Sequence, residues 1–360
     1  MKLLTARRRF AGARGEEMMS RRAFAGLMGL TAAGLAGCAG GTDGGSARAG
    51  SVQAGEDSST AAPTPQVTGD TRIFDVIDNP LFEGFGRLIF PTGFCEPTSD
   101  MTLADMPSIL PWYSEIHTST TVDIVSYLLA QRAAGKTVFY DIYSNEEKAR
   151  YLSLADTGLF HFAVEGLEPG ERAPFAVVCA GGGFAYVAAM HDSFPHCLHL
   201  ARAGFNGFAI IYRPDAQLAC EDLSRAVSFI FEHADELGVD TSGYSLWGGS
   251  AGARMAAYVG GWGTAAFGGD AVPQPATVVM QYTGHRELSG ANPATYACVG
   301  DRDGIASWRT MQARQDALAA QGVPTEFHVY EGLRHGFGLG LDTVAEGWID
   351  HAISFWQAQR

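Results

Sequence analysis

The sequence has little positive charge for its length. Its 25 lysine and arginine residues are outnumbered by 39 aspartate and glutamate residues, so the formal net charge is −14 over 360 residues. Because the phosphate backbone of a nucleic acid attracts basic surfaces, this balance argues against a nucleic-acid partner. Internal repeats are lacking too, and beyond the N-terminal segment no apolar run is long enough to span a bilayer. The hydrophobic content of 46% supports one large core or two modest ones.

Cysteine is also scarce, with six residues in the whole chain. Once Cys38 is set aside for the reason given below, an odd number remains, so at least one thiol is unpaired or bonded to another molecule. Cys179 and Cys298 lie in apolar, strand-like runs. A free buried thiol is expected at both positions.

The N-terminal segment has the features of an export signal. Arg21 and Arg22 precede an apolar stretch, and small residues then lead to Cys38 in the run LAGC. SRRAF resembles a twin-arginine signal and LAGC a bacterial lipobox, which implies cleavage before Cys38 and lipidation of its sulfur. The alternative is an ordinary secretory signal with a chance arginine pair and a chance cysteine. We expect residues 1–38 to be a signal peptide and the protein to be lipid-anchored to the bacterial cell membrane, outside the cytoplasm.

The next segment has the composition of a linker. Residues 39–70 are rich in Gly, Ser, Thr, Ala and Asp and almost lack large apolar side chains, so they cannot build a core. We expect a flexible linker here and one folded domain over residues 71–360. Residues 71–135 are a candidate cap region within that domain.

Predicted strands and helices alternate along the rest of the chain. Continuous apolar runs such as APFAVVC indicate strands buried on both faces, and apolar residues at helical spacing indicate the helices between them. This alternation is typical of an α/β protein with a mostly parallel sheet covered by helices on both faces. Strands are predicted at 136–143, 158–166, 173–183, 206–213, 244–249, 276–282, 295–301 and 325–332, and helices at 120–136, 196–205, 220–238, 251–261, 308–322 and 344–359.

One serine stands in a distinctive setting. Ser250 is the centre of a G-x-S-x-G run, Gly248 to Gly252, between a predicted strand and a predicted helix. That context separates a nucleophile elbow from a chance match, because side chains two residues either side of the serine would collide with the neighbouring strand and helix. A helix cap is the plainer alternative, but a cap does not need flanking glycines. We predict that Ser250 is a nucleophile.

A serine nucleophile needs a base and a group that orients this base. Asp301 and Asp303 follow one predicted strand, and His335 follows the last one. Serine, acid and histidine therefore occur in the chain order that a nucleophile elbow of this type uses. We predict His335 as the base, and position alone leaves both aspartates open as the acid.

In combination, these motifs resemble the α/β-hydrolase superfamily, near its hormone-sensitive-lipase-like and its acetyl- and feruloyl-esterase-like esterases. The resemblance covers residues 139–360 and implies an α/β-hydrolase fold with a small N-terminal cap region. The family's acid closes a G-x-x-D turn, which implies Asp303 as the acid, with Asp301 as the alternative. It also implies a serine carboxylesterase that needs no metal or organic cofactor.

A glycine run is expected to form an oxyanion hole. Gly181, Gly182 and Gly183 follow an earlier predicted strand and resemble the family's H-G-G-G or P-G-G-G segment, although Ala180 stands where relatives carry histidine or proline. Backbone N–H groups of Gly182, Gly183 and Ala251 are the expected donors. A phosphate-binding loop is excluded, because neither Gly-Lys-Ser/Thr nor G-x-G-x-x-G follows.

Other residues near these motifs are candidates for lining a substrate pocket, with an ordinary core position as the alternative for each. They are Phe184, Tyr186, His191 and His285. No metal site is predicted from His191, His196 and His199, because no second carboxylate or cysteine follows at ligand spacing.

The predicted activity is the hydrolysis of short-chain acyl esters on small-molecule or carbohydrate-linked substrates. The short segment between Ser250 and Asp303 leaves little room for a large lid, which favours a fairly open cleft. Two other functions remain open at this stage. One is a serine peptidase or acylaminoacyl hydrolase, and the other is a non-catalytic binding lipoprotein on a hydrolase scaffold.

Overall fold

The computed structural model describes residues 66–91, 97–168 and 170–360. The predicted signal peptide, Cys38, Cys95 and most of the predicted linker lie outside the described residues. The last linker residues are described, and they are held in place: the N–H of Thr68 donates to Oγ1 of Thr71 over 2.9 Å, and the carbonyl of Gly69 accepts from the N–H of Ala104 over 3.0 Å. The described residues form one compact unit.

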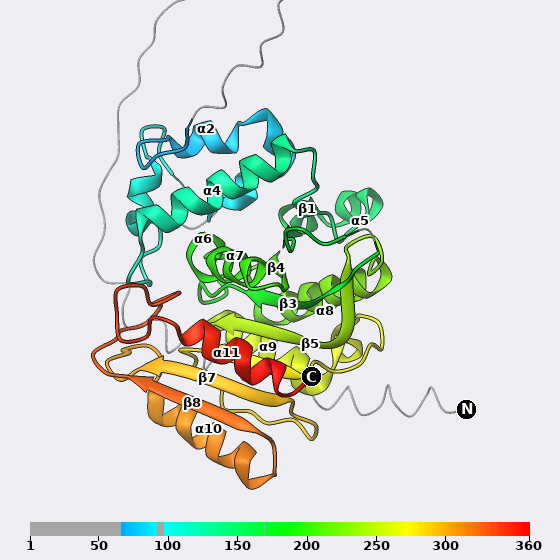
Figure 1. The fold of residues 1–360 in the computed structure, drawn as a ribbon, viewed down its shortest axis with the longest axis vertical. Coiled ribbons are helices and arrows are strands. Elements are labelled where there is room, and N and C mark those ends of the chain that lie inside the picture. The colour runs from blue at the N-terminus through cyan, green and yellow to red at the C-terminus, as the bar shows by residue number, and fades with distance from the viewer. Residues whose placement is uncertain (1–65, 92–96, 169) are drawn as a thin grey trace, which may run out of the picture. The chain divides into compact units, whose positions relative to one another are not determined.

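An eight-stranded sheet is the centre of this unit, with the strand order β1-β2-β4-β3-β5-β6-β7-β8 (Figure 1). The β1–β2 and β2–β4 pairs are antiparallel, and every other neighbouring pair is parallel. The predicted, mostly parallel sheet is therefore confirmed. The strands are β1 (Phe139–Tyr140), β2 (Gly158–Phe162), β3 (Ala173–Cys179), β4 (Asn206–Ile211), β5 (Val239–Gly249), β6 (Thr277–Gln281), β7 (Ala294–Gly300) and β8 (Thr325–Tyr330).

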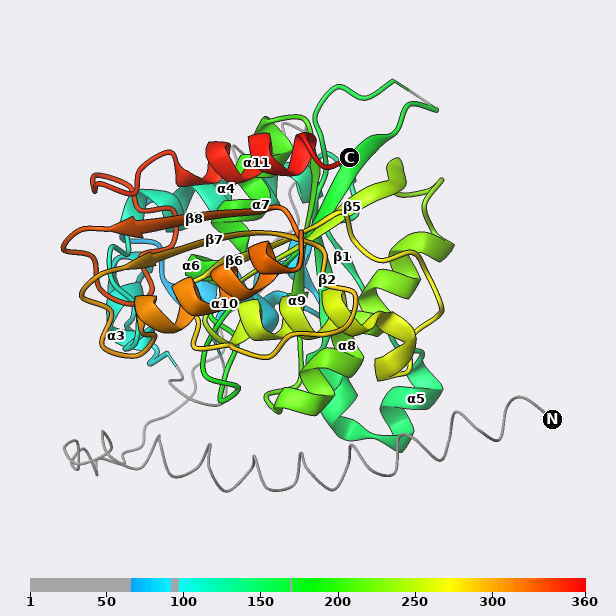
Figure 2. The same ribbon diagram turned by 90° about the horizontal axis from the view of Figure 1, so that it is seen from below.

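Helices cover both faces of the sheet, as predicted. α8, α9 and α10 lie on one face, and α7 and α11 lie on the other (Figure 2). The bounds from residue 139 onward are α5 (Asn145–Arg150), η4 (Leu152–Asp156), α6 (Ala189–Asp192), α7 (Phe194–Arg202), α8 (Ala216–Glu232), α9 (Ala251–Trp262), η5 (Thr264–Phe267), α10 (Trp308–Ala320) and α11 (Trp348–Gln357).

Three elements differ from their predicted extents. β5 begins at Val239, five residues before the predicted start at Tyr244, because the polar run before Tyr244 still pairs with β3 across a register shift between Pro174 and Ala176. The first strand is much shorter than predicted and keeps only Phe139 and Tyr140. α11 begins at Trp348, four residues after the predicted start at Val344.

The core is built on the strands of the parallel sheet. Every residue of β6 and β7 is buried, as a strand covered on both faces requires. Cys179, Cys197, Cys220 and Cys298 are buried, and the thiols of Cys179 and Cys298 are free, which confirms the expectation for these two. None of the described helices is long and apolar enough to cross a membrane.

Residues 66–135 form a separate helical layer at the start of the described chain. Its elements are α2 (Ile73–Ile77), η1 (Pro80–Phe82), η2 (Gly86–Ile89), η3 (Leu103–Asp105), α3 (Met106–Ile109) and α4 (Thr118–Ala133). α4 buries Ile124, Val125, Leu128 and Leu129, a helical spacing that makes one apolar face. α4 packs against α7, so the layer is attached to the central sheet through a helix that itself lies on β4.

Candidate active site

The turn that holds Ser250 is sharp and strained. Ser250 lies between the end of β5 and the first residue of α9 with φ 52° and ψ −115°, a conformation that L-residues rarely adopt. A Cβ on Gly248 would lie 2.3 Å from the carbonyl carbon of Gly252, and one on Gly252 would lie 1.9 Å from the carbonyl oxygen of Cys179 in β3. Both glycines are therefore required by contact, for the reason expected from the sequence.

The structure brings Ser250, His335 and Asp303 together in one chain of hydrogen bonds. Nε2 of His335 lies 3.0 Å from Oγ of Ser250, and Nδ1 of His335 lies 2.8 Å from Oδ2 of Asp303. These residues come from three different strand ends, those of β5, β7 and β8. The arrangement can move a proton from the serine hydroxyl to an imidazole that a carboxylate holds in one tautomer.

The two candidate acids have separate surroundings. Asp303 is completely buried at its side chain, and its Oδ1 accepts hydrogen bonds of 2.7 Å from the N–H groups of Ile305 and Ala306. Asp301 is exposed, and its Oδ1 accepts from the N–H of Gly332 over 2.7 Å. Only Asp303 contacts His335, so the geometry favours Asp303 in the orienting role.

The glycine loop passes directly beside the serine. A Cβ on Gly181 would lie 2.8 Å from Cβ of Ser250, and a Cβ on Gly182, which has φ +126°, would lie 2.1 Å from the carbonyl oxygen of Tyr186. Within the described residues, the N–H groups of Gly182 and Gly183 donate to no other group. Ala251 is the first residue of α9, where a helix leaves its N–H without an intrahelical acceptor. Ala251 thus follows Ser250 directly, and Gly182 and Gly183 follow Gly181, which lies against Ser250.

A buried carboxylate beside this loop was not predicted from the sequence. Asp192, in α6, is completely buried, and its Oδ2 accepts from the N–H of Gly181 over 2.6 Å and from the Tyr113 hydroxyl over 3.2 Å. Its Oδ1 accepts from the hydroxyl of Tyr282. Burial raises the pKa of Asp192 to about 6, although the hydrogen bonds from Tyr282 and Gly181 oppose the shift. Asp192 therefore ties the glycine loop to two other segments.

The helical layer contacts the same site through residues between α3 and α4. Oγ of Ser114 donates to the carbonyl of His335 over 3.0 Å, and the N–H of Ser114 donates to the carbonyl of Gly336 over 3.1 Å. The ring of Trp112 lies 5.4 Å from that of Tyr186. Residues 112–114 thus hold the backbone of the histidine loop and touch the glycine-loop side of the site.

The four candidate pocket residues lie at different places. Phe184 and Tyr186 are buried directly after the glycine loop. His191 is buried, and its Nε2 donates to the carbonyl of Gly336 over 2.9 Å, which supports the histidine loop. Burial lowers the pKa of His191 to about 4. His285 pairs with Glu287 over 3.0 Å and packs edge-on against Tyr258 of α9.

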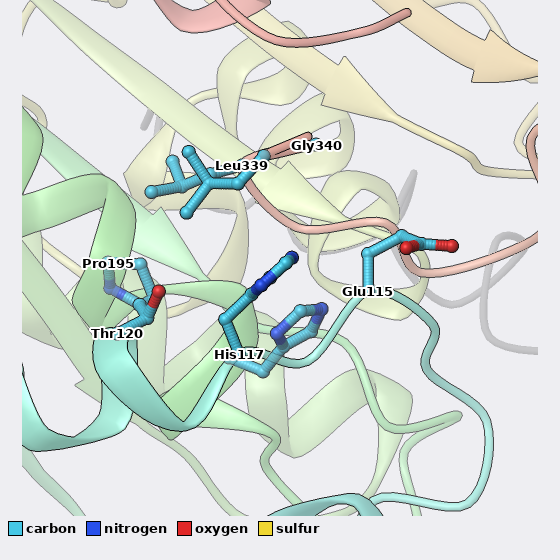
Figure 3. A pocket seen from close by; sticks show the side chains of 8 residues that line it. Glu115, His117, Thr120, Pro195, Leu339 and Gly340 are labelled. Atoms are coloured by element: carbon cyan, nitrogen blue, oxygen red, sulfur yellow. The ribbon is translucent and has the colours of Figure 1, made fainter. Parts of the chain in front are cut away.

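A small cavity lies behind the histidine loop. Figure 3 shows His117 and Thr120 facing Leu339 and Gly340 across it. Its volume is ≈ 10 Å³, which is room for about one water molecule and not for an organic ligand. The cavity is a packing gap next to His191.

The three histidines that invite a metal interpretation have separate partners. Nε2 of His196 lies 2.9 Å from Oε1 of Gln281, and Nε2 of His199 lies 2.7 Å from Oδ1 of Asp350. His191 is engaged with the histidine loop, as described above. Their rings therefore do not converge on a common centre.

Comparison with known proteins found one matching family model and several similar solved structures. Residues 167–284 match the model of the BD-FAE family. The acetyl ester-xyloside bifunctional hydrolase from Caldicellulosiruptor lactoaceticus is similar in structure, with 20% identity and a TM-score of 0.53 over 61% of this chain and 95% of that one. Esterase 2 of Thermogutta terrifontis with butyrate bound gives 19% identity and a TM-score of 0.51 over 61% and 93%.

The same esterase phosphoramylated by tabun gives 22% identity and a TM-score of 0.50 over 56% of this chain and 89% of that one. No curated protein matches this chain in sequence. The strand order, the strained turn at Ser250 and these similarities together show that residues 139–360 have the α/β-hydrolase fold, similar to that of solved esterases.

Proposed function

We propose that the protein is a serine carboxylesterase with Ser250, His335 and Asp303 as its catalytic triad. The observation that carries this proposal is the unbroken chain of contacts from Oγ of Ser250 through His335 to Oδ2 of Asp303, at 3.0 Å and 2.8 Å. A non-catalytic scaffold has no need to hold a strained serine against a buried imidazole and carboxylate.

The geometry supports a two-step mechanism. Nε2 of His335 takes the proton of the Ser250 hydroxyl as Oγ attacks the ester carbonyl, and then gives this proton to the leaving alcohol. The N–H groups of Gly182, Gly183 and Ala251 stabilise the oxyanion, and each donor lowers the activation barrier by roughly 3 kcal/mol. His335 next activates the water that hydrolyses the acyl-enzyme.

Short acyl groups are the proposed substrates, and residues 71–135 are the proposed cap. A Cβ on Gly181 would lie 2.5 Å from the hydroxyl of Tyr113 and 2.8 Å from Cβ of Ser250. Tyr113 therefore lies close to the nucleophile and limits the space beside it. This arrangement supports acetyl- to butyryl-sized acyl groups over long lipid chains.

The proposed location is outside the cytoplasm, through a lipid on Cys38. The support is the twin-arginine pair and the LAGC run in the sequence. A Cys38→Ser variant is expected to move from the membrane fraction to the soluble extracytoplasmic fraction. Equal membrane retention of both proteins would overturn the anchor.

The activity is tested with protein that lacks residues 1–38 and with its Ser250→Ala variant. We expect hydrolysis of aryl acetate and butyrate, little hydrolysis of aryl octanoate, and loss of all three in the variant. A fluorophosphonate probe is expected to label only the protein that keeps Ser250. If both proteins are inert and unlabelled, the non-catalytic alternative replaces the esterase; if only aryl amides are cleaved, the peptidase alternative does.

A further inference from the structure

A second pocket lies outside the proposed triad, between α10 and the loop after β6. It has a volume of ≈ 340 Å³ and is lined by Arg286, Arg309, Thr310, Ala313, Arg314 and Ala317. The five α10 residues are spaced to share one helix face. The small side chains of Ala313 and Ala317 leave open volume between the arginines. This volume lies within the range of small-molecule sites.

Arg314 is the unusual residue of this pocket. Its side chain is buried, with only 6% of the residue exposed, and Nε and Nη1 have no hydrogen-bond partner among the described residues. A buried charged group without partners is costly, so a guanidinium with two unpaired, buried donors beside a pocket is stabilised when an anion binds there. Burial lowers the pKa of Arg314 to about 10, so the group still carries its charge at neutral pH.

The carboxylate next to Arg314 is committed to other groups. Oε2 of Glu287 pairs with Nδ1 of His285 over 3.0 Å and accepts from the N–H of Arg286 over 3.1 Å. Oε1 of Glu287 lies 3.9 Å from Nη2 of Arg254. Both oxygens of Glu287 thus have other partners, and no hydrogen bond joins either of them to Arg314 among the described residues.

The two other arginines of the pocket are exposed. Arg286 precedes Glu287 in the loop, and the guanidinium of Arg309 lies 4.3 Å over the ring of Trp308. A contact of this kind uses the face of the guanidinium and leaves the donors at its edge able to bind an oxygen. The pocket is therefore a local cluster of positive charge on a chain whose net charge is −14.

We propose that this pocket is an anion-binding site for a carboxylate or phosphate group, with Arg314 as its buried anchor and Arg286 and Arg309 at its rim. Planar guanidinium groups match the oxygens of both anions, and a concave positive site concentrates anions from solution. The anion has two potential sources. It is either the acidic part of an ester substrate or a separate small anion, and the test distinguishes them.

The test of binding uses the full chain and inorganic phosphate, with sodium chloride at matched ionic strength as the reference. Phosphate is expected to raise the Tm saturably in the wild type. The affinity is expected to fall about tenfold or more in an Arg286→Ala/Arg309→Ala double variant and in Arg314→Met. Arg150→Ala, which removes an exposed arginine paired with Glu146 on α5, is the matched control and is expected to bind phosphate like the wild type.

The double variant keeps the test decisive if Arg314→Met fails to fold, because its two substitutions are at exposed positions. No saturable Tm rise in the wild type, or an equal rise in the double variant, would overturn the proposal. Arg314 would then be a structural residue that packs through its aliphatic stem.

The source of the anion is tested with a matched pair of four-carbon acyl esters, an aryl hemisuccinate and an aryl butyrate. A hemisuccinate-to-butyrate ratio of kcat/KM that falls about tenfold in the double variant assigns the anion to the substrate. Loss of phosphate binding with an unchanged ratio assigns it to a separate ligand. Only this arm rests on the proposed esterase activity, and butyrate hydrolysis by the wild type shows independently whether that activity holds.

Discussion

Two buried aspartates lie near the Ser250–His335 pair, and they are held in different ways. Asp303, in the loop after β7, binds His335 directly and accepts two backbone N–H groups. Asp192, in α6, binds no ionisable base and accepts from two phenols and the N–H of Gly181. The first carboxylate contacts the proposed base, and the second holds the segments that surround it.

The difference shows that burial alone does not mark the catalytic acid. The ring of Tyr282 lies edge-on to His335 at 5.1 Å, so Asp192 contacts a residue that packs on the base but does not hydrogen-bond to the base itself. Burial raises the pKa of Tyr113 and of Tyr282, which keeps both hydroxyls as neutral donors to Asp192 at neutral pH. Asp192 is therefore expected to act as a positioning residue, and Asp303 as part of the triad.

Substitution of Asp303 is expected to have the largest effect on activity. Asp303→Asn is expected to lower kcat for aryl butyrate about 10³- to 10⁴-fold with little change in KM, because an amide no longer holds the reactive tautomer of His335. Asp301→Asn is the matched control, and its kcat is expected to stay within about threefold of the wild type, since it loses only a surface hydrogen bond. A severe loss in Asp301→Asn with a mild one in Asp303→Asn would reverse the assignment.

The second prediction concerns stability and the charge of Asp192. Its folded pKa of about 6 lies above the ordinary aspartate value of 3.8, so between these two values the folded protein holds the proton more tightly than the unfolded chain does. The free energy of unfolding therefore falls as pH rises from about 4 through 6, because Asp192 ionises in the unfolded state before it ionises in the folded state, and this cost is absent below about pH 4. From pH 4 to pH 7, the wild type is expected to lose on the order of 2–3 kcal/mol relative to Asp192→Asn.

Chemical denaturation of both proteins at several pH values measures this difference. Groups that do not interact with Asp192 contribute equally in both proteins, so their contributions cancel when the two free energies of unfolding are subtracted. A difference that stays constant with pH, or that changes in the wild type's favour as pH rises, would show that Asp192 does not carry the proposed burial cost.

The same contrast explains how far the sequence could predict the molecule. The strands of the parallel sheet are continuous apolar runs. Ser250 lies in a G-x-S-x-G pattern of five consecutive residues, so the tight turn can be recognised from local sequence alone. Asp303 and His335 each follow a strand end, and the carboxyl ends of parallel strands meet at one edge. Local pattern and sheet topology together were enough to predict the fold, Ser250 and His335. They left Asp301 and Asp303 open as the acid, and only the family resemblance favoured Asp303, the one that contacts His335.

The hydrogen bonds that join Asp192 to Tyr113, Gly181 and Tyr282 could not be predicted in this way. Tyr113 and Asp192 are separated by 79 residues, and Asp192 and Tyr282 by 90, so no local pattern links them. The described residues between 66 and 117 form short helical turns without a sustained apolar periodicity. Their contacts with the histidine loop join segments far apart in the sequence, so the local pattern does not predict them. The one usable signal was the position of Asp192 next to His191, shortly after the glycine loop.

A smaller effect is expected on activity when Asp192 loses its charge. Asp192→Asn is expected to lower kcat/KM about tenfold, because the donor from Gly181 binds a neutral amide more weakly than a carboxylate and the glycine loop loses part of its hold. The kcat/KM profile should also lose an ionisation near pH 6. Asp222→Asn is the matched control, since Asp222 in α8 is equally buried but pairs with Arg213 in the loop before that helix. This variant is expected to lose stability and to keep the pH profile of kcat/KM unchanged.

The smallest expected effect tests whether the helical layer contributes to Asp192's role. Tyr113→Phe removes one hydrogen bond of 3.2 Å to Asp192 and keeps the ring, so kcat/KM is expected to fall only about threefold. Tyr127→Phe is the control within the same layer, because its hydroxyl contacts the carbonyl of Ala163 and not the site. Steady-state assays of both variants decide the question. Equal activity in the two would mean that Asp192 is held from the sheet side alone, through Gly181 and Tyr282, and that the layer acts on the site only through Ser114 and the histidine loop.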